Sequence, residues 1–301
     1  MIILACGPSL EKIINGPMSK RKHPPRTARS RINAPRPTGT AARTGTKSPH
    51  HTGTTHGLWL YGIHAVAAAI QNPARKRHRL IATKPASESL KEALPDGFTV
   101  DIDTEIVDRS EIDTVCGPDS VHQGLALLVS PLADLYIEDV IDPDLQADSL
   151  ATDTLVVLDQ ATDPRNIGAV LRSARAFGVR AVILQDRNAP PETGAMAKAA
   201  SGALEHVAMV RVTNLARAMW TLKDAGYWCL GLDGYSDIDI GTVDPTPKRV
   251  VVLGAEGTGL RRLTRETCDQ LVCIPMDKNA ESLNLSNAAA IALYVVTRKR
   301  G

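Results

Sequence analysis

The order of apolar and polar positions divides the chain near Leu58. Residues 1–57 show no sustained helical or strand period, and Pro24-Pro25 and further prolines interrupt them. We therefore expect a disordered tail in this part of the chain. From Leu58 onward, apolar runs of strand length alternate with segments of helical period, a pattern that is typical of α/β folds.

Residues 58–130 carry the first alternation and predict a small α/β domain. Its expected helices are Gly62–Gln71, Ser87–Leu94 and Arg109–Cys116, and its expected strands are Arg79–Thr83, Phe98–Ile102 and Gly124–Val129. Residues 131–151 contain Pro131, Pro143 and several acidic side chains. We interpret this stretch as an interdomain linker.

Residues 152–301 predict a second, larger α/β domain. Strands are expected at Leu155–Leu158, Ala181–Leu184, Val207–Val210, Tyr227–Leu232, Val250–Leu253 and Leu271–Ile274, and helices at Pro164–Phe177, Glu192–Ala200, Leu215–Ala225, Arg261–Thr267 and Ser286–Arg300. Such regular alternation indicates a parallel sheet with helices on both faces. Ligands of these sheets bind at the carboxyl ends of the strands.

Charge is distributed unevenly along the chain, although the formal net charge is only +2. Residues 1–57 hold ten basic side chains and one acidic side chain, whereas the rest of the chain holds 25 basic and 32 acidic ones. Such a basic arm can attract the phosphates of a nucleic acid. A solvated solubility tail and an organellar transit peptide are the alternatives, and Met18 is an alternative start of the protein.

Composition excludes several other classes of protein. Apolar residues make up 43% of the chain, which is enough for a core, and no window of 18 apolar residues predicts a membrane span. The five cysteines are scattered and form no CxxC pair. We therefore expect neither a disulfide framework nor a metal site, and a cytoplasmic location.

The first polar loop of the larger domain leads from the strand ending at Leu158 into the helix that begins at Pro164. Asp163 can cap this helix, and proline suits its first position. Asn166 then lies in the first turn, where free N–H groups and the helix dipole favour an anion. Arg172 lies more than a turn and a half further on, where an isolated arginine most often forms a surface ion pair.

The second loop, Gly254–Gly259, reads Gly-Ala-Glu-Gly-Thr-Gly and follows an apolar strand. Its three glycines allow the backbone to approach a ligand closely. The order of the glycines fits neither a phosphate-binding Walker A loop nor a dinucleotide fingerprint. On spacing alone, a tight turn without a ligand is the favoured interpretation.

The third loop begins with Ile274-Pro275-Met276 and continues to the run Ser282–Ser286, which reads Ser-Leu-Asn-Leu-Ser. An alanine-rich helix follows, so Ser286 is the expected N-cap. Taken alone, all polar residues of this run could serve in capping.

In their order and combination, the three loops resemble the motifs of the SpoU/TrmH-type branch of the SPOUT methyltransferases. The resemblance extends from about Leu58 to the C-terminus. Residues 201–217, residues 260–269 and the start of the small domain are similar to the subgroup that methylates a guanosine 2′-hydroxyl of large-subunit (23S) ribosomal RNA.

This resemblance implies a parallel α/β domain tied into a trefoil knot, with a smaller N-terminal RNA-binding domain. It also implies a homodimer whose interface contains the helix Ser286–Arg300. The resemblance implies S-adenosylmethionine as cofactor, bound by Leu253, Gly254, Gly257, Ile274, Met276 and Leu283. The catalytic residues that it implies are Asn166, Arg172, Glu256, Ser282 and Asn284.

Arg172 matches the catalytic arginine of the family. A protonated guanidinium cannot accept a proton, so Arg172 either acts after activation in the RNA complex or positions the phosphate and the ribose. One residue departs from the family pattern: Asn287 stands where the subgroup usually has a small apolar residue. This difference puts the local packing of the expected dimer in question.

Three alternative functions stay open on the sequence. The first is the same reaction on tRNA, against which the small domain argues. The second is a catalytically silent RNA-binding factor of ribosome assembly. The third is a nucleotide-binding α/β enzyme with an unusual glycine loop.

Overall fold

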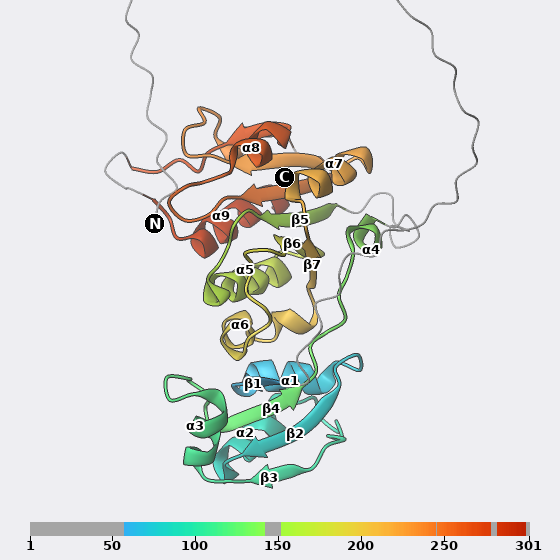
Figure 1. Ribbon diagram of the computed structural model, residues 1–301, viewed down its shortest axis with the longest axis vertical. Coiled ribbons are helices and arrows are strands. Elements are labelled where there is room, and N and C mark those ends of the chain that lie inside the picture. Colours follow the sequence, from blue (N-terminus) through green and yellow to red (C-terminus); the bar gives the residue numbers. More distant parts are fainter. Residues whose placement is uncertain (1–56, 142–151, 245, 278–281, 299–301) are drawn as a thin grey trace, which may run out of the picture. The chain divides into compact units, whose positions relative to one another are not determined.

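Two sheets organise the chain in the computed structural model, which describes residues 57–141, 152–244, 246–277 and 282–298 (Figure 1). The expected tail lies outside the described residues except for Gly57, and so does the second half of the expected linker. All described residues belong to one compact unit.

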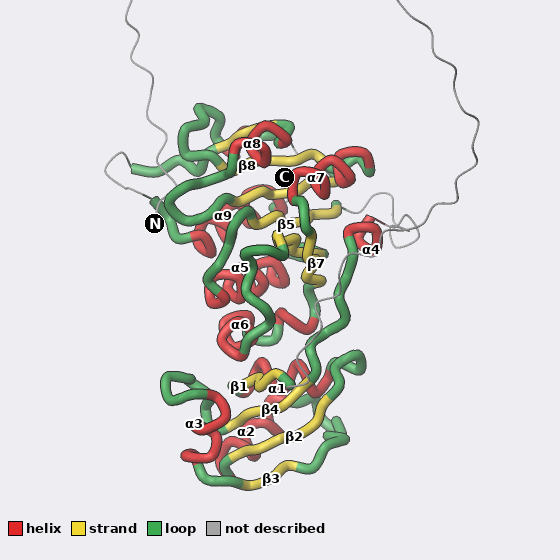
Figure 2. Tube along the Cα trace, viewed as in Figure 1, coloured by secondary structure: helices red, strands yellow, loops and turns green. Residues whose placement is uncertain are grey.

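The first sheet has four strands in the order β1-β4-β2-β3. Strand β4 is antiparallel to β1 and β2, and β3 is parallel to β2. Figure 2 shows these strands with their helices. The elements are β1 Leu58–Tyr61, α1 Ile63–Gln71, β2 Arg77–Ala82, α2 Lys84–Ala93, β3 Thr104–Ile106, α3 Arg109–Cys116 and β4 Leu125–Val129.

The prediction of a strand at Phe98–Ile102 is wrong. The third strand of this sheet is β3, which lies later in the chain. Phe98 is exposed after a turn in which its N–H bonds the Pro95 carbonyl, and Val100 and Ile102 pack against the core without joining the ladder. Apolar alternation therefore arises here from packing and not from strand pairing. The sequence analysis also missed the short strand β1.

The second sheet contains six parallel strands in the order β10-β8-β9-β5-β6-β7. This confirms the parallel α/β prediction for the larger domain. Its strands are β5 Asp153–Leu158, β6 Ala181–Gln185, β7 Ala208–Val212, β8 Trp228–Leu232, β9 Lys248–Leu253 and β10 Gln270–Val272. Its helices are α5 Pro164–Ala176, α6 Gly194–Ala200, α7 Leu215–Asp224, α8 Arg262–Thr267 and α9 Leu285–Thr297, with short 3₁₀ helices η2 Ala203–Glu205 and η3 Ile240–Thr242.

Helices cover both faces of this sheet because its strands are apolar on both sides. In β5, Val156 and Leu158 belong to a core that contains residues of α5, α6 and α9. Their neighbours Leu155 and Val157 belong to a second core with residues of α4 and α7. Successive strand residues point to opposite faces, so each strand contributes to both cores.

The stretch expected as a linker contains one element of its own. Helix α4, Ile137–Ile141, buries Ile137 and Val140 in the second core. Leu135 forms an isolated parallel bridge with Val210. The described part of this stretch is therefore packed on the six-stranded sheet, since its apolar residues find partners there.

The predicted start of α5 is confirmed, whereas that of α9 needs correction. The Asp163 carboxylate accepts a hydrogen bond from the Arg165 N–H at 2.9 Å, as a helix cap does. Helix α9 is capped by Asn284 and not by Ser286, because the Asn284 Oδ1 accepts both the N–H of Ser286 at 2.8 Å and its hydroxyl at 2.6 Å. Helix α9 therefore begins at Leu285.

A buried arginine joins the two sheet-bearing parts of the chain. The Arg75 side chain is fully buried, and its Nε and Nη2 donate to the two carboxylate oxygens of Glu205 at 3.1 and 2.7 Å. Its Nη1 donates to Glu192 at 3.0 Å and to the Ser130 carbonyl at 3.1 Å. Asn72 also donates to Glu205, at 2.7 Å. Burial raises the pKa of Glu192, and Arg75 opposes that rise.

We expect Arg75→Met to lower the free energy of unfolding by about 3–5 kcal/mol, because Glu192 and Glu205 lose their counter-charge in a buried site. Urea unfolding at pH 7 measures this change. Arg79 is the matched control, since it also contacts two glutamates but its side chain is 38% exposed. Arg79→Met should cost less than about 1 kcal/mol. Equal losses for the two variants would contradict the role of burial.

Candidate functional site

The three polar loops of the sequence analysis follow strands β5, β9 and β10 of the parallel sheet. The β5 loop leads into α5, the β9 loop is the glycine loop, and the segment after β10 leads into α9 (Figure 1). Strands β5 and β9 are direct neighbours, with Leu158 opposite Leu253. Because parallel strands end at the same edge of a sheet, their loops meet there.

One carboxylate oxygen joins the three loops. The Oε1 atom of Glu256 accepts hydrogen bonds from the Asn166 Nδ2 at 2.6 Å and from the Asn284 Nδ2 at 3.0 Å. The Asn284 Nδ2 also donates to the Asn166 Oδ1 at 3.0 Å, and the Leu285 N–H points to Glu256 Oε1 at 3.4 Å. Three of the five expected catalytic residues therefore form one hydrogen-bonded cluster, which we call the Glu256 cluster.

Two helix N-termini meet this carboxylate. Asn166 lies in the first turn of α5, and Asn284 is the N-cap of α9. The N-terminus of a helix carries partial positive charge, which attracts a carboxylate. The cluster thus combines charge-assisted hydrogen bonds with two helix dipoles.

The glycine loop is shaped by close backbone contacts. A Cβ atom on Gly254 would lie 2.1–2.3 Å from backbone atoms of Gly259 and Leu260, which no side chain can accommodate. Ala255 and Gly259 exchange two backbone hydrogen bonds of 3.1 and 3.2 Å. Gly257 has φ 93°, a conformation that favours glycine. The loop is therefore a tight closed turn, and the glycines are required for its shape.

Apolar residues expected at the cofactor flank this loop. Leu253 is fully buried and Ile274 is 9% exposed. Met276 and Leu283 are partly buried and pack against the same core cluster. Together with the tight backbone turn that Gly254 allows, such walls suit an adenine, which needs apolar surfaces and a few backbone partners.

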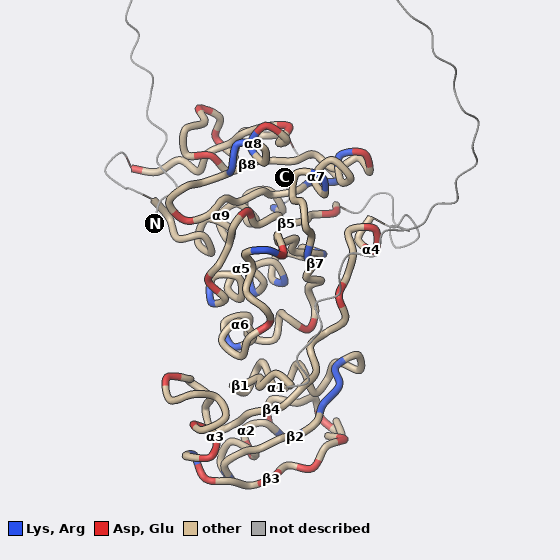
Figure 3. The backbone as a smooth tube through the Cα atoms, viewed as in Figure 1, with Lys and Arg blue, Asp and Glu red and all other residues tan. Residues whose placement is uncertain are grey.

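Arg172 and Ser282 lie outside the Glu256 cluster. Arg172 is exposed on α5, and no hydrogen bond or ion pair of its side chain occurs within the described chain. Ser282 is half-buried at the start of the described segment before α9. Figure 3 shows further basic positions along α5, and Arg165 and Arg175 are exposed there as well.

Asn287, the residue that departs from the family pattern, is exposed in the first turn of α9. The cap of that helix is Asn284, so Asn287 is not needed for capping. It shares one face of the helix with Ile291 and Tyr294, which follow it at intervals of four and three residues.

The sequence analysis assigned no role to Asp159, which the structure places at the base of the glycine loop. Its side chain is fully buried and pairs with Arg261, Oδ1 lying 2.6 Å from the Arg261 Nη2. The sequence offered one signal for this pair. Asp159 directly follows an apolar strand, and Arg261 lies two residues after the glycine loop.

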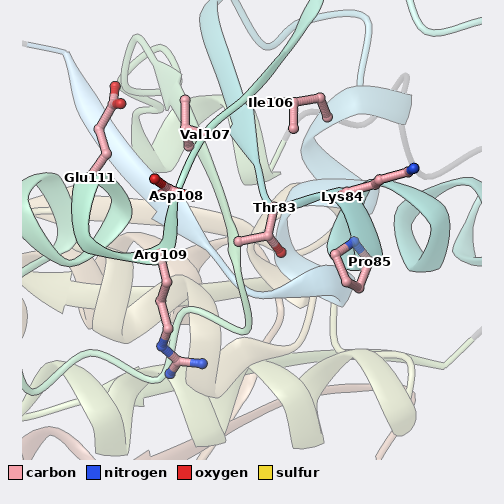
Figure 4. A pocket seen from close by; sticks show the side chains of 8 residues that line it. All are labelled: Thr83, Lys84, Pro85, Ile106, Val107, Asp108, Arg109 and Glu111. Atoms are coloured by element: carbon pink, nitrogen blue, oxygen red, sulfur yellow. The ribbon is translucent and has the colours of Figure 1, made fainter.

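A separate pocket of about 550 Å³ lies on the small domain (Figure 4). It is lined by residues that follow β2 and β3, namely Thr83, Lys84, Pro85, Ile106, Val107, Asp108, Arg109 and Glu111. None of them belongs to the three loops. Two basic and two acidic side chains share the rim, so their charges balance and do not select an anion.

The described residues contain no group of three or more histidine, cysteine, aspartate or glutamate side chains that could hold a metal ion. No helix in the described ranges is long and apolar enough to cross a membrane.

Comparisons with known proteins agree with this geometry. Residues 153–294 match the SpoU rRNA Methylase family, and residues 59–135 match a family described as RNA 2′-O ribose methyltransferase substrate binding. A relative from Vibrio cholerae, named 23S rRNA (guanosine-2′-O-)-methyltransferase RlmB, is 40% identical over 242 residues, covering 80% of this chain and 96% of the relative. The chain belongs to the SpoU methylase family.

Other members of this family have similar sequences and folds. The Escherichia coli K12 protein of the same RlmB name is 39% identical over 245 residues, covering 80% of this chain and 98% of that protein. The crystal structure of the SpoU methyltransferase AviRb from Streptomyces viridochromogenes in complex with AdoMet has a TM-score of 0.65 at 24% identity. That match covers 80% of this chain and 89% of AviRb.

We expect Glu256→Ala to release the loops that the Glu256 cluster joins. Losing a charged acceptor should speed amide hydrogen exchange in residues 284–290 and 254–260 about tenfold. Hydrogen-exchange mass spectrometry of the protein without ligands measures this. Glu266→Ala is the control, because its partner among the described residues is the exposed Arg262 in the preceding turn of α8. Unchanged exchange in Glu256→Ala would show that the cluster does not hold the loops.

Proposed function

We propose that the protein transfers a methyl group from S-adenosylmethionine to the 2′-hydroxyl of a guanosine ribose in 23S ribosomal RNA. The observation that carries this proposal is the Glu256 cluster, in which Asn166, Glu256 and Asn284 from three loops meet beside the glycine loop. Membership of the SpoU methylase family supports the reaction and the cofactor. The RlmB names of the relatives support the RNA class.

The residues present fit S-adenosylmethionine. Gly254 is buried, and its lack of a side chain lets the turn close against Gly259 and Leu260. Apolar surface beside it comes from Leu253, Ile274, Met276 and Leu283. Gly257 keeps the turn closed. When bound, the cofactor supplies an electrophilic methyl group on a sulfonium.

The protein's own contribution is orientation and polar contact. A ribose hydroxyl is a weak nucleophile, so its alignment with the methyl group should supply much of the rate. Asn166 and Asn284 are fixed by Glu256 and can direct the ribose, with Ser282 close to Asn284 in the chain. Arg172 is unpaired within the described chain, and its guanidinium is suited to hold an RNA phosphate.

We propose a separate role for each part of the chain. Residues 58–130 bind RNA, and residues 131–151 connect them to the methyltransferase domain of residues 152–301. The C-terminal segment of that domain forms the knot of the SPOUT fold. Residues 1–57 add sequence-independent attraction to phosphates. Action on ribosomal RNA places the enzyme in the cytoplasm.

We also propose a homodimer formed through the outer face of α9. The alanines of this helix do not supply that face, because Ala288, Ala289 and Ala292 are fully buried in the core of their own chain. The outer face instead carries Ile291, 38% exposed, and Tyr294, 55% exposed. An exposed apolar stripe of this kind is typical of contacts between subunits.

Methylation of purified 23S ribosomal RNA from a strain that lacks the enzyme tests the proposed function. We expect one ribose-methylated guanosine with the wild type, and a rate at least about 100-fold lower with Arg172→Ala, at an unchanged affinity for S-adenosylmethionine. Arg262→Ala, at an exposed arginine of α8, is the control. Methylation of tRNA alone would support the tRNA enzyme, and cofactor binding with neither RNA methylated would refute the catalytic proposal.

The dimer predicts that Tyr294→Glu yields a monomer, because a charge would be buried at the interface. Light scattering coupled to size exclusion measures the mass. Tyr235→Glu, at a residue that is 74% exposed outside α9, should keep the mass of the wild type. A wild-type protein that is monomeric at micromolar concentration would refute the dimer.

A further inference from the structure

Asp159, the residue directly after β5, forms hydrogen bonds with both ends of the glycine loop. The Asp159 N–H donates to the carbonyl of Leu253, the last residue of β9, at 2.8 Å. Its carboxylate accepts two hydrogen bonds from Arg261, the first residue after Leu260, and forms an ion pair with the same guanidinium. The backbone N–H of Arg261 lies 3.0 Å from Oδ2, and its Nε lies 2.7 Å from Oδ1. The loop between Leu253 and Arg261 is therefore closed through Asp159.

The charge of Asp159 requires this partner. Its side chain is 0% exposed, and a buried carboxylate is stable only when it is paired and hydrogen-bonded. The Arg261 side chain is 37% exposed, so its guanidinium reaches the buried carboxylate from the surface. The guanidinium Nε and Nη2 both contact Oδ1, while the backbone N–H of Arg261 occupies Oδ2, so both carboxylate oxygens are engaged. The pair is thus a rigid link, unlike the solvent-exposed contact of Arg262 with Glu266.

We infer that Asp159 and Arg261 are a positioning pair that holds the loop Gly254–Leu260 in its cofactor-binding shape. The backbone around Gly254 and the carboxylate of Glu256 both depend on the path of this loop. The pair therefore sets the affinity for S-adenosylmethionine, while methyl transfer itself depends on other residues. This inference rests on the proposed function only for the identity of the cofactor.

Equilibrium binding of S-adenosylmethionine to the full chain, by calorimetry, tests the pair through a double-mutant cycle. We expect Asp159→Asn and Arg261→Met each to weaken binding about tenfold or more, and the double variant to bind no worse than the weaker single variant. Arg261→Lys keeps the charge but not the paired contacts, so it should recover only part of the affinity. Arg262→Met, at the neighbouring exposed arginine, should bind as the wild type does.

Kinetics and hydrogen exchange separate positioning from other roles. The KM for S-adenosylmethionine should rise in the single variants, with kcat at saturating cofactor within about threefold of the wild type. Residues 254–261 should exchange faster without any cofactor present. If Asp159→Asn does not fold, the two Arg261 variants carry the same comparison, because Arg261 is partly exposed.

Three results would overturn the inference. Unchanged binding and exchange in the Arg261 variants would show that the loop holds its shape without the pair. Independent, additive effects in the cycle would show that the two residues do not act through each other. A raised KM for RNA with a weaker salt dependence, at unchanged cofactor affinity, would make Arg261 a phosphate ligand. A wild type that binds the cofactor but methylates no RNA would refute the proposed function and leave this inference standing.

Discussion

The carboxylate of Glu256 is the interaction on which the site depends. It draws donors from the start of α5 and the start of α9, which are separated by more than one hundred residues of chain. The Asn166 side chain from the first turn of α5 and the Asn284 side chain that caps α9 both donate to it, and the Leu285 N–H of α9 points to the same oxygen. The geometry of the reacting region therefore follows from where two helices begin on one sheet edge.

Much of this could be predicted from the sequence, and the failures have physical reasons. The central strands β5, β6 and β9 were visible because they are buried on both faces and read as continuous apolar runs. Phe98–Ile102 alternates as a strand does, yet no neighbouring strand offers it hydrogen bonds. Asn284 caps α9 because its Oδ1 accepts a hydrogen bond from the Ser286 N–H, while its Nδ2 donates to Glu256. The local sequence does not reveal the bond to Glu256, so it cannot decide between Asn284 and Ser286 as the cap.

The partners of the long-range polar pairs could not be predicted from the sequence. Arg75 meets Glu205 across 130 positions, and Asp159 meets Arg261 across 102. Nothing in the local pattern of either residue specifies its partner. Such pairs also change the meaning of the acidic surplus outside the tail, since these carboxylates serve to neutralise arginines inside the fold. Net charge is then a weak guide to RNA affinity, and the exposed arginines of α5 are a better one.

The order of strands also constrains how the protein is made. Strand β5 lies in the middle of its sheet, but its neighbour β9 is 95 residues further along the chain, Asp153 pairing with Lys248. At ordinary translation speeds, those residues take about 5–20 s to synthesise. During that interval the edge of β5 that will pair with β9 presents unpaired backbone N–H and C=O groups, and the loops around Glu256 cannot yet meet. The site can therefore form only after most of the larger domain has been synthesised.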